Sequence, residues 1–275
     1  MQNQAPLRDY HLHTLYSFDS QQSPAALADA AERAGLCEIC VTDHIDLGYI
    51  LPEGAQPPDL ARRRADLDAA RRAHPGLHIL EGIEIGDNPA ERGNILAFLR
   101  AHALDFHLLS LHMVDGGDPY FPAFFAGRAR ADAYRRYAEC AAASVAAWDP
   151  ADYDCAAHLG YVAKFAPYAD KPFRWRDAPD AIDAVLRCLA QNGKALEINT
   201  SSLKNSPETM ASADILRRFR ELGGELVTLG SDAHAPEYVG YRLDYARELA
   251  LSCGFRYGAA YARRTLRAYK LENAG

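Results

Sequence analysis

The stretch LRDYHLHTLYSFDSQQSPAALADAAERAG, residues 7–35, contains one complete unit of a strand followed by a helix. We expect a strand over Leu7–His11 and a helix that starts at Ser23 and Pro24. A serine side chain can accept a hydrogen bond at the N-cap, and the fixed φ of proline suits the first helical turn. Gly35 then supplies the stop after the helix.

The same order of strand and helix recurs along the chain. Short apolar runs predict further strands at residues 38–42, 77–85, 106–111, 153–157, 195–198 and 226–230. Helical segments are expected at 59–73, 91–100, 128–147, 179–192 and 207–222, and from Leu243 onward the chain is expected to be mostly helical. Seven such units predict an α/β fold with a parallel sheet and helical crossovers. We favour one domain, residues 1–275, built as a TIM-like β/α barrel, over an open doubly wound sheet.

Composition narrows the class of protein. The chain has 275 residues, of which 49% are hydrophobic, so it can bury a large core. Its formal net charge is −7, and no Lys/Arg run provides the basic surface that a general nucleic-acid binder needs. No apolar run reaches the ~18 residues that span a bilayer, and residues 1–4 do not resemble the start of a signal peptide. The expected location is therefore the cytoplasm, with no membrane or nucleic-acid partner.

The six cysteines do not form the dense pattern of a disulfide framework. Cys37 and Cys40 have CxxC spacing, but no second pair of zinc ligands at matching spacing follows. We therefore expect free thiols that are buried or half-buried.

Histidine and acidic residues cluster at the carboxyl ends of the expected strands. In a barrel these ends open on one face, where the active site is built. His11 and His13 are two residues apart on one strand, so both imidazoles can reach the same ion. Asp232 and His234 repeat this spacing on the last strand. Imidazoles together with carboxylates are typical ligands of Zn, Mn or Fe, so the pattern predicts a metal site.

Six ordered motifs resemble those of the polymerase and histidinol phosphatase (PHP) superfamily. They are Asp9-Tyr10-His11-Leu12-His13-Thr14, Thr42-Asp43-His44, Gly82-Ile83-Glu84, Ser110-Leu111-His112, Ala157-His158 and Gly230-Ser231-Asp232-Ala233-His234. Three further stretches narrow the resemblance to the histidinol-phosphate phosphatase branch. They are Leu196-Glu197-Ile198-Asn199-Thr200-Ser201, Val239-Gly240-Tyr241-Arg242 and the Tyr-rich helix after the strand at 106–111. The resemblance implies a distorted seven-stranded β/α barrel that holds three divalent metal ions.

Carried over by position, the resemblance also implies a ligand set. The first ion would be held by His11, His13, Glu84 and Asp232, the second by Glu84, His112 and His158, and the third by Asp19, His44 and His234. Glu84 would bridge the first two ions. Glu81 lies only three residues earlier and is interpreted as inward-facing or as supporting the ligands.

Two positions depart from the pattern of this branch, which often has Asp and Arg where this chain has Gly160 and Lys164. A lysine is a point charge rather than a bidentate fork, so the orientation of a bound phosphate can differ. Lys164 is the first candidate for a phosphate contact, and Arg242 is the second. Asp46, two residues after His44, is the candidate general acid.

The resemblance implies a metal-dependent phosphomonoesterase whose partner is a small phosphate ester, most specifically L-histidinol phosphate, as in histidine biosynthesis. The loop over residues 113–127 carries acids and aromatic rings that could receive a cationic amine and an imidazole: Asp115, Asp118, Tyr120, Phe121, Phe124 and Phe125. Two alternatives are a phosphoesterase for another small ester, diester or nucleotide, and a non-catalytic metal-binding module. Every expected ligand position is filled, which speaks against the second alternative.

Overall fold

A computed structural model describes residues 5–272 as one α/β unit. Its strands are β1 (Leu7–Leu12), β2 (Leu36–Val41), β3 (His44–Ile45), β4 (His78–Gly86), β5 (Phe106–Ser110), β6 (Cys155–Ala156), β7 (Ala195–Asn199), β8 (Val227–Gly230), β9 (Tyr257–Ala262) and β10 (Thr265–Lys270). Its helices are α1 (Pro24–Arg33), α2 (Leu60–Ala73), α3 (Arg92–Ala101), α4 (Pro122–Phe125), α5 (Arg130–Ala147), α6 (Pro179–Gln191), α7 (Ala213–Glu221) and α8 (Leu243–Ser252).

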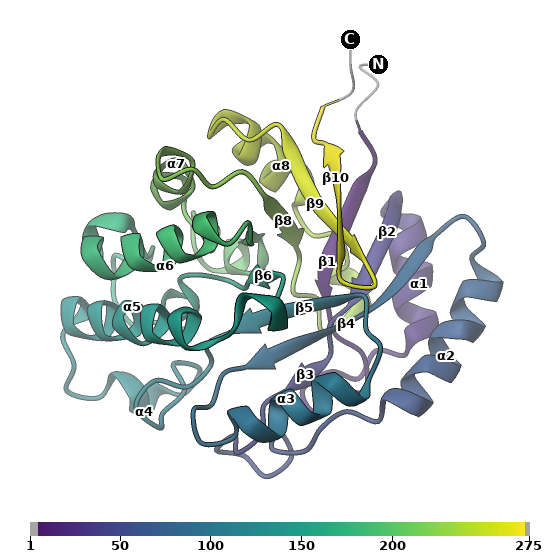
Figure 1. Cartoon of the computed structure of the whole chain (residues 1–275), viewed down its shortest axis with the longest axis horizontal. Helices are drawn as coiled ribbons and strands as arrows, with labels where there is room; N and C mark the ends of the chain where they lie inside the picture. The colour runs from purple at the N-terminus through teal and green to yellow at the C-terminus, as the bar shows by residue number, and fades with distance from the viewer. Residues whose placement is uncertain (1–4, 273–275) are drawn as a thin grey trace.

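The strands form one ten-stranded sheet in the order β1-β2-β4-β5-β6-β7-β8-β9-β10, with β3 paired to β4. The pairs from β1 to β8 are parallel, as the alternation of strands and helices predicts. Helices lie around the outside of these strands, with α1 and α2 on one side and α5 to α7 on the other (Figure 1). The carboxyl ends of the parallel strands consequently meet on one face.

The first and last parallel strands meet where the metal ligands are expected. The backbone N–H of His13 donates to the carbonyl of Ala233, and that of Asp232 donates to the carbonyl of His11, over 3.0 and 2.9 Å. The buried carboxylate of Asp9 accepts hydrogen bonds from Ser231 N, Ser231 Oγ and the backbone N–H of Gly240. Burial outweighs these bonds and raises the pKa of Asp9 to about 6. These contacts join the two ends of the chain segment that carries the site.

The opposite end is covered by the hairpin of β9 and β10, which corrects one prediction. The chain after Leu243 is helical only to Ser252 and then turns into two antiparallel strands. The buried ring of Tyr261 on β9 lies 5.0 Å from Phe106, and its backbone N–H bonds to the hydroxyl of Tyr10. Residues 258–261 of β9 are therefore buried in the interior, whereas Tyr257 at its start is exposed, and our helical interpretation missed this strand.

Local signals explain most element boundaries. The side chain of Ser23 accepts from the N–H of Ala26, as predicted, and that of Asp59 accepts from the N–H of Arg62 at the start of the helix expected at 59–73. The expected helix at 207–222 starts only at Ala213, because residues before it form turns and a bridge between Met210 and Asn199. The strand β3 and the short helix α4 were not predicted.

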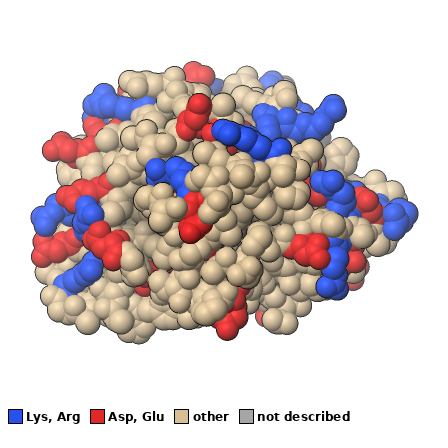
Figure 2. Space-filling view, turned by 60° about the horizontal axis from the view of Figure 1, so that its bottom comes forward, with Lys and Arg blue, Asp and Glu red and all other residues tan. Residues whose placement is uncertain are grey.

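All six cysteines are free and are buried or half-buried, as expected. Acidic and basic side chains lie interspersed on the face drawn in Figure 2. Within residues 5–272, no helix combines the length and apolar character needed to cross a membrane.

Candidate metal centre

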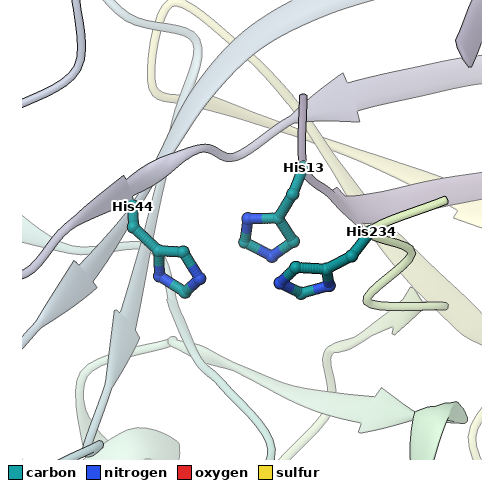
Figure 3. A group of neighbouring side chains, drawn as sticks. All are labelled: His13, His44 and His234. Carbon is teal, nitrogen blue, oxygen red and sulfur yellow. The ribbon is translucent and has the colours of Figure 1, made fainter. Parts of the chain in front are cut away.

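Side chains from separate strands converge at the carboxyl ends of the sheet. Four groups of nitrogen and oxygen atoms lie close enough to share an ion: His13/His44/His234, His11/His13/Glu84, His44/Asp46/His112 and Glu84/His112/His158. The rings of His13, His44 and His234 point toward one another from three different segments (Figure 3). The centroid of the His13 ring lies 4.4 Å from that of His44 and 4.1 Å from that of His234. The structure thus brings His13 and His234 together, although they lie 221 positions apart in the sequence.

The first cluster surrounds Oε2 of Glu84. This oxygen lies 3.1 Å from His11 Nε2 and 3.4 Å from His13 Nε2. Oδ1 of Asp232 lies 3.8 and 3.4 Å from the same two nitrogens. Ligand atoms bound about 2.0–2.1 Å from one tetrahedral zinc ion are roughly 3.3 Å apart, so these four side chains match the spacing of a single ion.

The second cluster surrounds the other oxygen of Glu84. Oε1 lies 2.8 Å from His158 Nε2 and 3.1 Å from His112 Nε2. The hydroxyl of Ser110 also donates to this oxygen, which fixes the carboxylate. The two oxygens of one carboxylate consequently face two different groups of histidines, because Oε2 also lies 3.1 Å from Nδ1 of His44.

The third cluster lies nearer the surface. Oδ2 of Asp19 is 3.0 Å from His234 Nε2 and 3.6 Å from His44 Nε2. Burial raises the pKa of Asp19, but the imidazoles of His44 and His234 outweigh it and lower the pKa well below its ordinary value. The ring of His13 contacts both of these rings, so it borders the first and the third cluster.

Unpartnered buried atoms test whether a cation fits. Among the described residues, His11 Nε2, His13 Nε2, His44 Nδ1 and Glu84 Oε2 are buried without a hydrogen-bond partner. Buried polar atoms are normally satisfied, and lone pairs that converge in this way are what a cation requires. Burial, His234 and His44 together lower the pKa of His13 to about 3, which leaves it neutral as a ligand must be. The donor set therefore fits divalent metal ions.

Asp46 lies beneath the second cluster. Its Oδ1 accepts a hydrogen bond from His112 Nδ1 at 3.0 Å, and its Oδ2 lies 3.2 Å from His44 Nδ1. Burial raises the pKa of Asp46, but His112 and His44 outweigh it and lower the pKa to about 2. A carboxylate that accepts from the distal nitrogen of an imidazole fixes the tautomer and orientation of a metal-ligating histidine.

A pocket of about 440 Å³ opens above these clusters. Lys164 and Asp118 line it, together with Phe18, Asp19, His44, Asp46, Tyr49, Leu51, Glu84, His112, Tyr120, Phe121, His158, Tyr161, Phe165, Asp232 and His234. Nζ of Lys164 lies 2.8 Å from Oδ2 of Asp232, at the edge of the first cluster. Asp118 is buried, and it accepts from the hydroxyl of Tyr49 and from the backbone N–H of Tyr120.

Several predicted residues lie elsewhere. Arg242 is exposed, adopts a φ of 54° before α8, and directs its guanidinium over the ring of Tyr245, so it is not among the residues that line the pocket. Glu81 faces the helix side of β4 and pairs with Arg64 and Arg71, because alternate strand residues point to opposite faces. It does not reach the clusters, which corrects its interpretation as an inward-facing residue.

The loop over residues 113–127 divides between the pocket and the rest of the molecule. Asp115 forms an ion pair with Arg136 on the surface, and Phe124 and Phe125 are buried in the core. The loop residues that line the pocket are Asp118, Tyr120 and Phe121.

Sequence reasoning gave no role to Glu197, although its motif was noted. Its carboxylate is buried against His11 and His158 inside the sheet. A buried acidic residue in the middle of an otherwise apolar strand was the available signal.

Comparisons with known proteins find histidinol-phosphatases that are similar to this chain in sequence and in fold. The chain is 29% identical to the histidinol-phosphatase of Lactococcus lactis over 262 residues, which cover 92% of this chain and 94% of that protein. It is 30% identical to a probable histidinol-phosphatase of Deinococcus radiodurans, with 88% of this chain and 92% of that protein covered. The crystal structure of the Lactococcus lactis histidinol phosphate phosphatase, complexed with zinc, L-histidinol and phosphate, matches with a TM-score of 0.87. That match covers 94% of this chain and 98% of the other at 29% identity.

The profile of the PHP domain matches residues 9–201, which is well over half of the 275 residues. This range contains the first two clusters apart from Asp232, and the match is independent of the geometry described above. The chain therefore belongs to the PHP domain family.

Proposed function

We propose that this chain hydrolyses L-histidinol phosphate to L-histidinol and phosphate, as a metal-dependent phosphomonoesterase. The observation that carries the proposal is the position of Glu84 in the lining of a pocket, with two oxygens that face two separate groups of histidines. The related enzyme from Lactococcus lactis, which binds zinc, L-histidinol and phosphate, supports the same activity.

The proposed centre holds three divalent ions, of zinc, manganese or iron. The first would be bound by His11, His13, Glu84 and Asp232, the second by Glu84, His112 and His158, and the third by Asp19, His44 and His234. The distances within each cluster support this division. The seven parallel strands from β1 to β8, with β3 set aside, would form a distorted closed barrel, and the backbone bonds between β1 and the end of β8 support that closure.

The ions, when bound, would activate a water for attack on phosphorus and neutralise charge on the phosphoryl oxygens. The protein would add Lys164 as a phosphate contact. One N–H of Lys164 is directed to Asp232, which leaves two donors for a ligand in the pocket. Asp46 would hold His112 through its hydrogen bond, and the general-acid role predicted for it remains the alternative.

Asp118 would recognise the amine of the substrate. Its buried carboxylate lines the pocket, and no Lys, Arg or His side chain pairs with it among residues 5–272. The rings of Tyr49, Tyr161 and Phe165 also line the pocket and offer flat apolar faces. A ligand with a positive charge and an aromatic ring would satisfy both features, and histidinol phosphate carries both.

The test compares substrates on the wild-type protein and on Asp118→Asn. We expect turnover of histidinol phosphate to exceed that of sugar and nucleoside phosphates by at least tenfold in kcat/KM. Asp118→Asn should raise KM for histidinol phosphate while leaving p-nitrophenyl phosphate, which has no amine, nearly unchanged. Asp115→Asn is the matched control, because Asp115 lies in the same loop but pairs with Arg136 on the surface. Equal turnover of all the esters would contradict histidinol phosphate as the substrate.

A further inference from the structure

Glu197 contacts two of the proposed ligands without being one itself. It lies on β7 and is 1% exposed. Its Oε1 is 2.7 Å from Nδ1 of His11, which comes from β1. Its Oε2 accepts from the backbone N–H of His158 at 2.7 Å and from Nδ2 of Asn199 at 3.2 Å. One carboxylate thus connects a side chain of the first cluster with the backbone that positions the second.

The contact with His11 determines which of its ring nitrogens can bind a metal. An ionised carboxylate only accepts, so Nδ1 of His11 must carry the hydrogen. In the neutral ring the lone pair then lies on Nε2, which faces Glu84 and Asp232. This nitrogen is buried and has no hydrogen-bond partner within the described chain. The arrangement is the one by which supporting carboxylates orient histidine ligands.

The neighbouring strand leaves space for this carboxylate. A Cβ atom at Gly230 on β8 would lie 2.1 Å from Oε1 of Glu197 and 2.7 Å from Cβ of His11. Any side chain at this position would push Glu197 away from His11. The glycine in the motif around residues 230–234 therefore has a packing role that is separate from the ligands themselves.

We propose that Glu197 is a positioning residue that holds His11 in its metal-binding tautomer and anchors His158, so that it couples the first and second metal sites. This inference rests on the proposed metal centre, but it does not depend on which phosphate ester is the substrate.

Two substitutions separate the charge of Glu197 from its shape. Glu197→Gln keeps the size, but its amide oxygen can serve His11 or the pair formed by His158 and Asn199, never both. When the amide oxygen accepts from His158 N and Asn199 Nδ2, the amide NH2 group faces Nδ1 of His11 and donates to it. The hydrogen of the neutral imidazole ring then lies on Nε2, and this nitrogen cannot bind a metal ion. Glu197→Asp is one methylene shorter but still only accepts, so it preserves the required tautomer.

The test measures zinc affinity of the full-length protein by competition with a chelator, alongside the Tm of the metal-free protein. Loss of such a supporting partner typically costs 10–100-fold in metal affinity. We expect Glu197→Gln to bind zinc 10–100-fold more weakly than wild type, and Glu197→Asp to recover part of that loss. Glu38→Gln is the matched control, because Glu38 is another buried carboxylate but bonds to Tyr10 at the opposite end of the sheet. It should lower the Tm and leave zinc affinity unchanged.

The inference is overturned if Glu197→Gln binds zinc as wild type does, or if Glu197→Asp binds more weakly than Glu197→Gln, since that order indicates packing alone. If Glu197→Gln does not fold, Glu197→Asp decides: a loss of zinc affinity smaller than tenfold supports the tautomer argument, and a loss of tenfold or more contradicts it. A wild-type protein that binds no zinc, manganese or iron would instead refute the proposed metal centre.

Discussion

Nε2 of His158 lies 2.8 Å from Oε1 of Glu84, whereas the other oxygen of the same carboxylate faces the first histidine cluster. Burial raises the pKa of Glu84, but the surrounding imidazoles outweigh it and lower the pKa well below its ordinary value. A carboxylate in this position can bridge two cations, which an amide cannot do.

Glu84→Gln should consequently lower metal content and phosphatase activity together. We expect at least one ion fewer per chain by elemental analysis and a fall in kcat of at least 100-fold. Glu81→Gln provides the control on the same strand, because Glu81 pairs with Arg64 and Arg71 outside the clusters. Near wild-type metal content and activity in Glu84→Gln would show that the bridge is elsewhere.

Asp46→Asn distinguishes orientation of His112 from proton donation. If Asp46 orients His112, the substitution should reduce metal content and slow alkyl and aryl phosphate monoesters by similar factors. General acid catalysis typically contributes about 10²–10⁴-fold, and it matters little for an aryl leaving group that needs no proton. We expect the loss of rate on alkyl monoesters, divided by the loss of rate on aryl monoesters, to be near one. A large loss on histidinol phosphate alone, with all metal retained, would instead identify Asp46 as the general acid.

Lys164→Ala should weaken binding of the phosphate group. Hydrogen bonds to charged groups are worth about 1.5–3 kcal/mol, so kcat/KM should fall roughly 10–100-fold and the inhibition constant of inorganic phosphate should rise in parallel. Metal content should be unchanged, because Asp232 keeps its carboxylate. Arg242→Ala is the control, since Arg242 is exposed beside Tyr245. If both variants bind phosphate as wild type does, Lys164 does not contact it.

His107 predicts a pH dependence of stability that is independent of the metal site. Burial and then the charge of Arg264 lower the pKa of His107 to about 3. The unfolded chain therefore takes up a proton near pH 6.5 that the folded chain does not, so stability falls as the pH drops from 6.5 toward 3. At pH 5 the loss is about 2 kcal/mol.

Between pH 7 and pH 5, the free energy of unfolding of metal-free His107→Gln should fall by about 2 kcal/mol less than that of the metal-free wild type. Urea denaturation at both pH values measures this difference. His78→Gln is the comparison, because the side chain of His78 is 71% exposed. Identical pH slopes for wild type and His107→Gln would contradict the effect of burial on this histidine.

Much of the fold, and the convergence of most predicted ligand side chains on one face, could be predicted because the decisive signals are local. Ser23, Asp59 and Gly35 set helix ends through their own chemistry, and histidines at strand ends mark the face where a parallel sheet collects them. The β9–β10 hairpin was not predictable in this way, since Tyr261 is stabilised by Tyr10 and Phe106, which are distant in sequence. Arg242 was predicted to contact phosphate because of its position in a sequence motif. The direction of its side chain depends instead on the turn before α8, which the motif does not reveal.

The most direct test of the account follows metal content and turnover of histidinol phosphate on the same samples, during chelation and then during re-addition of zinc or manganese. We predict that the purified protein holds two to three divalent ions per chain, that activity disappears as they are removed, and that it returns with them. Full turnover by protein that retains less than one tenth of an ion per chain would contradict the metal centre.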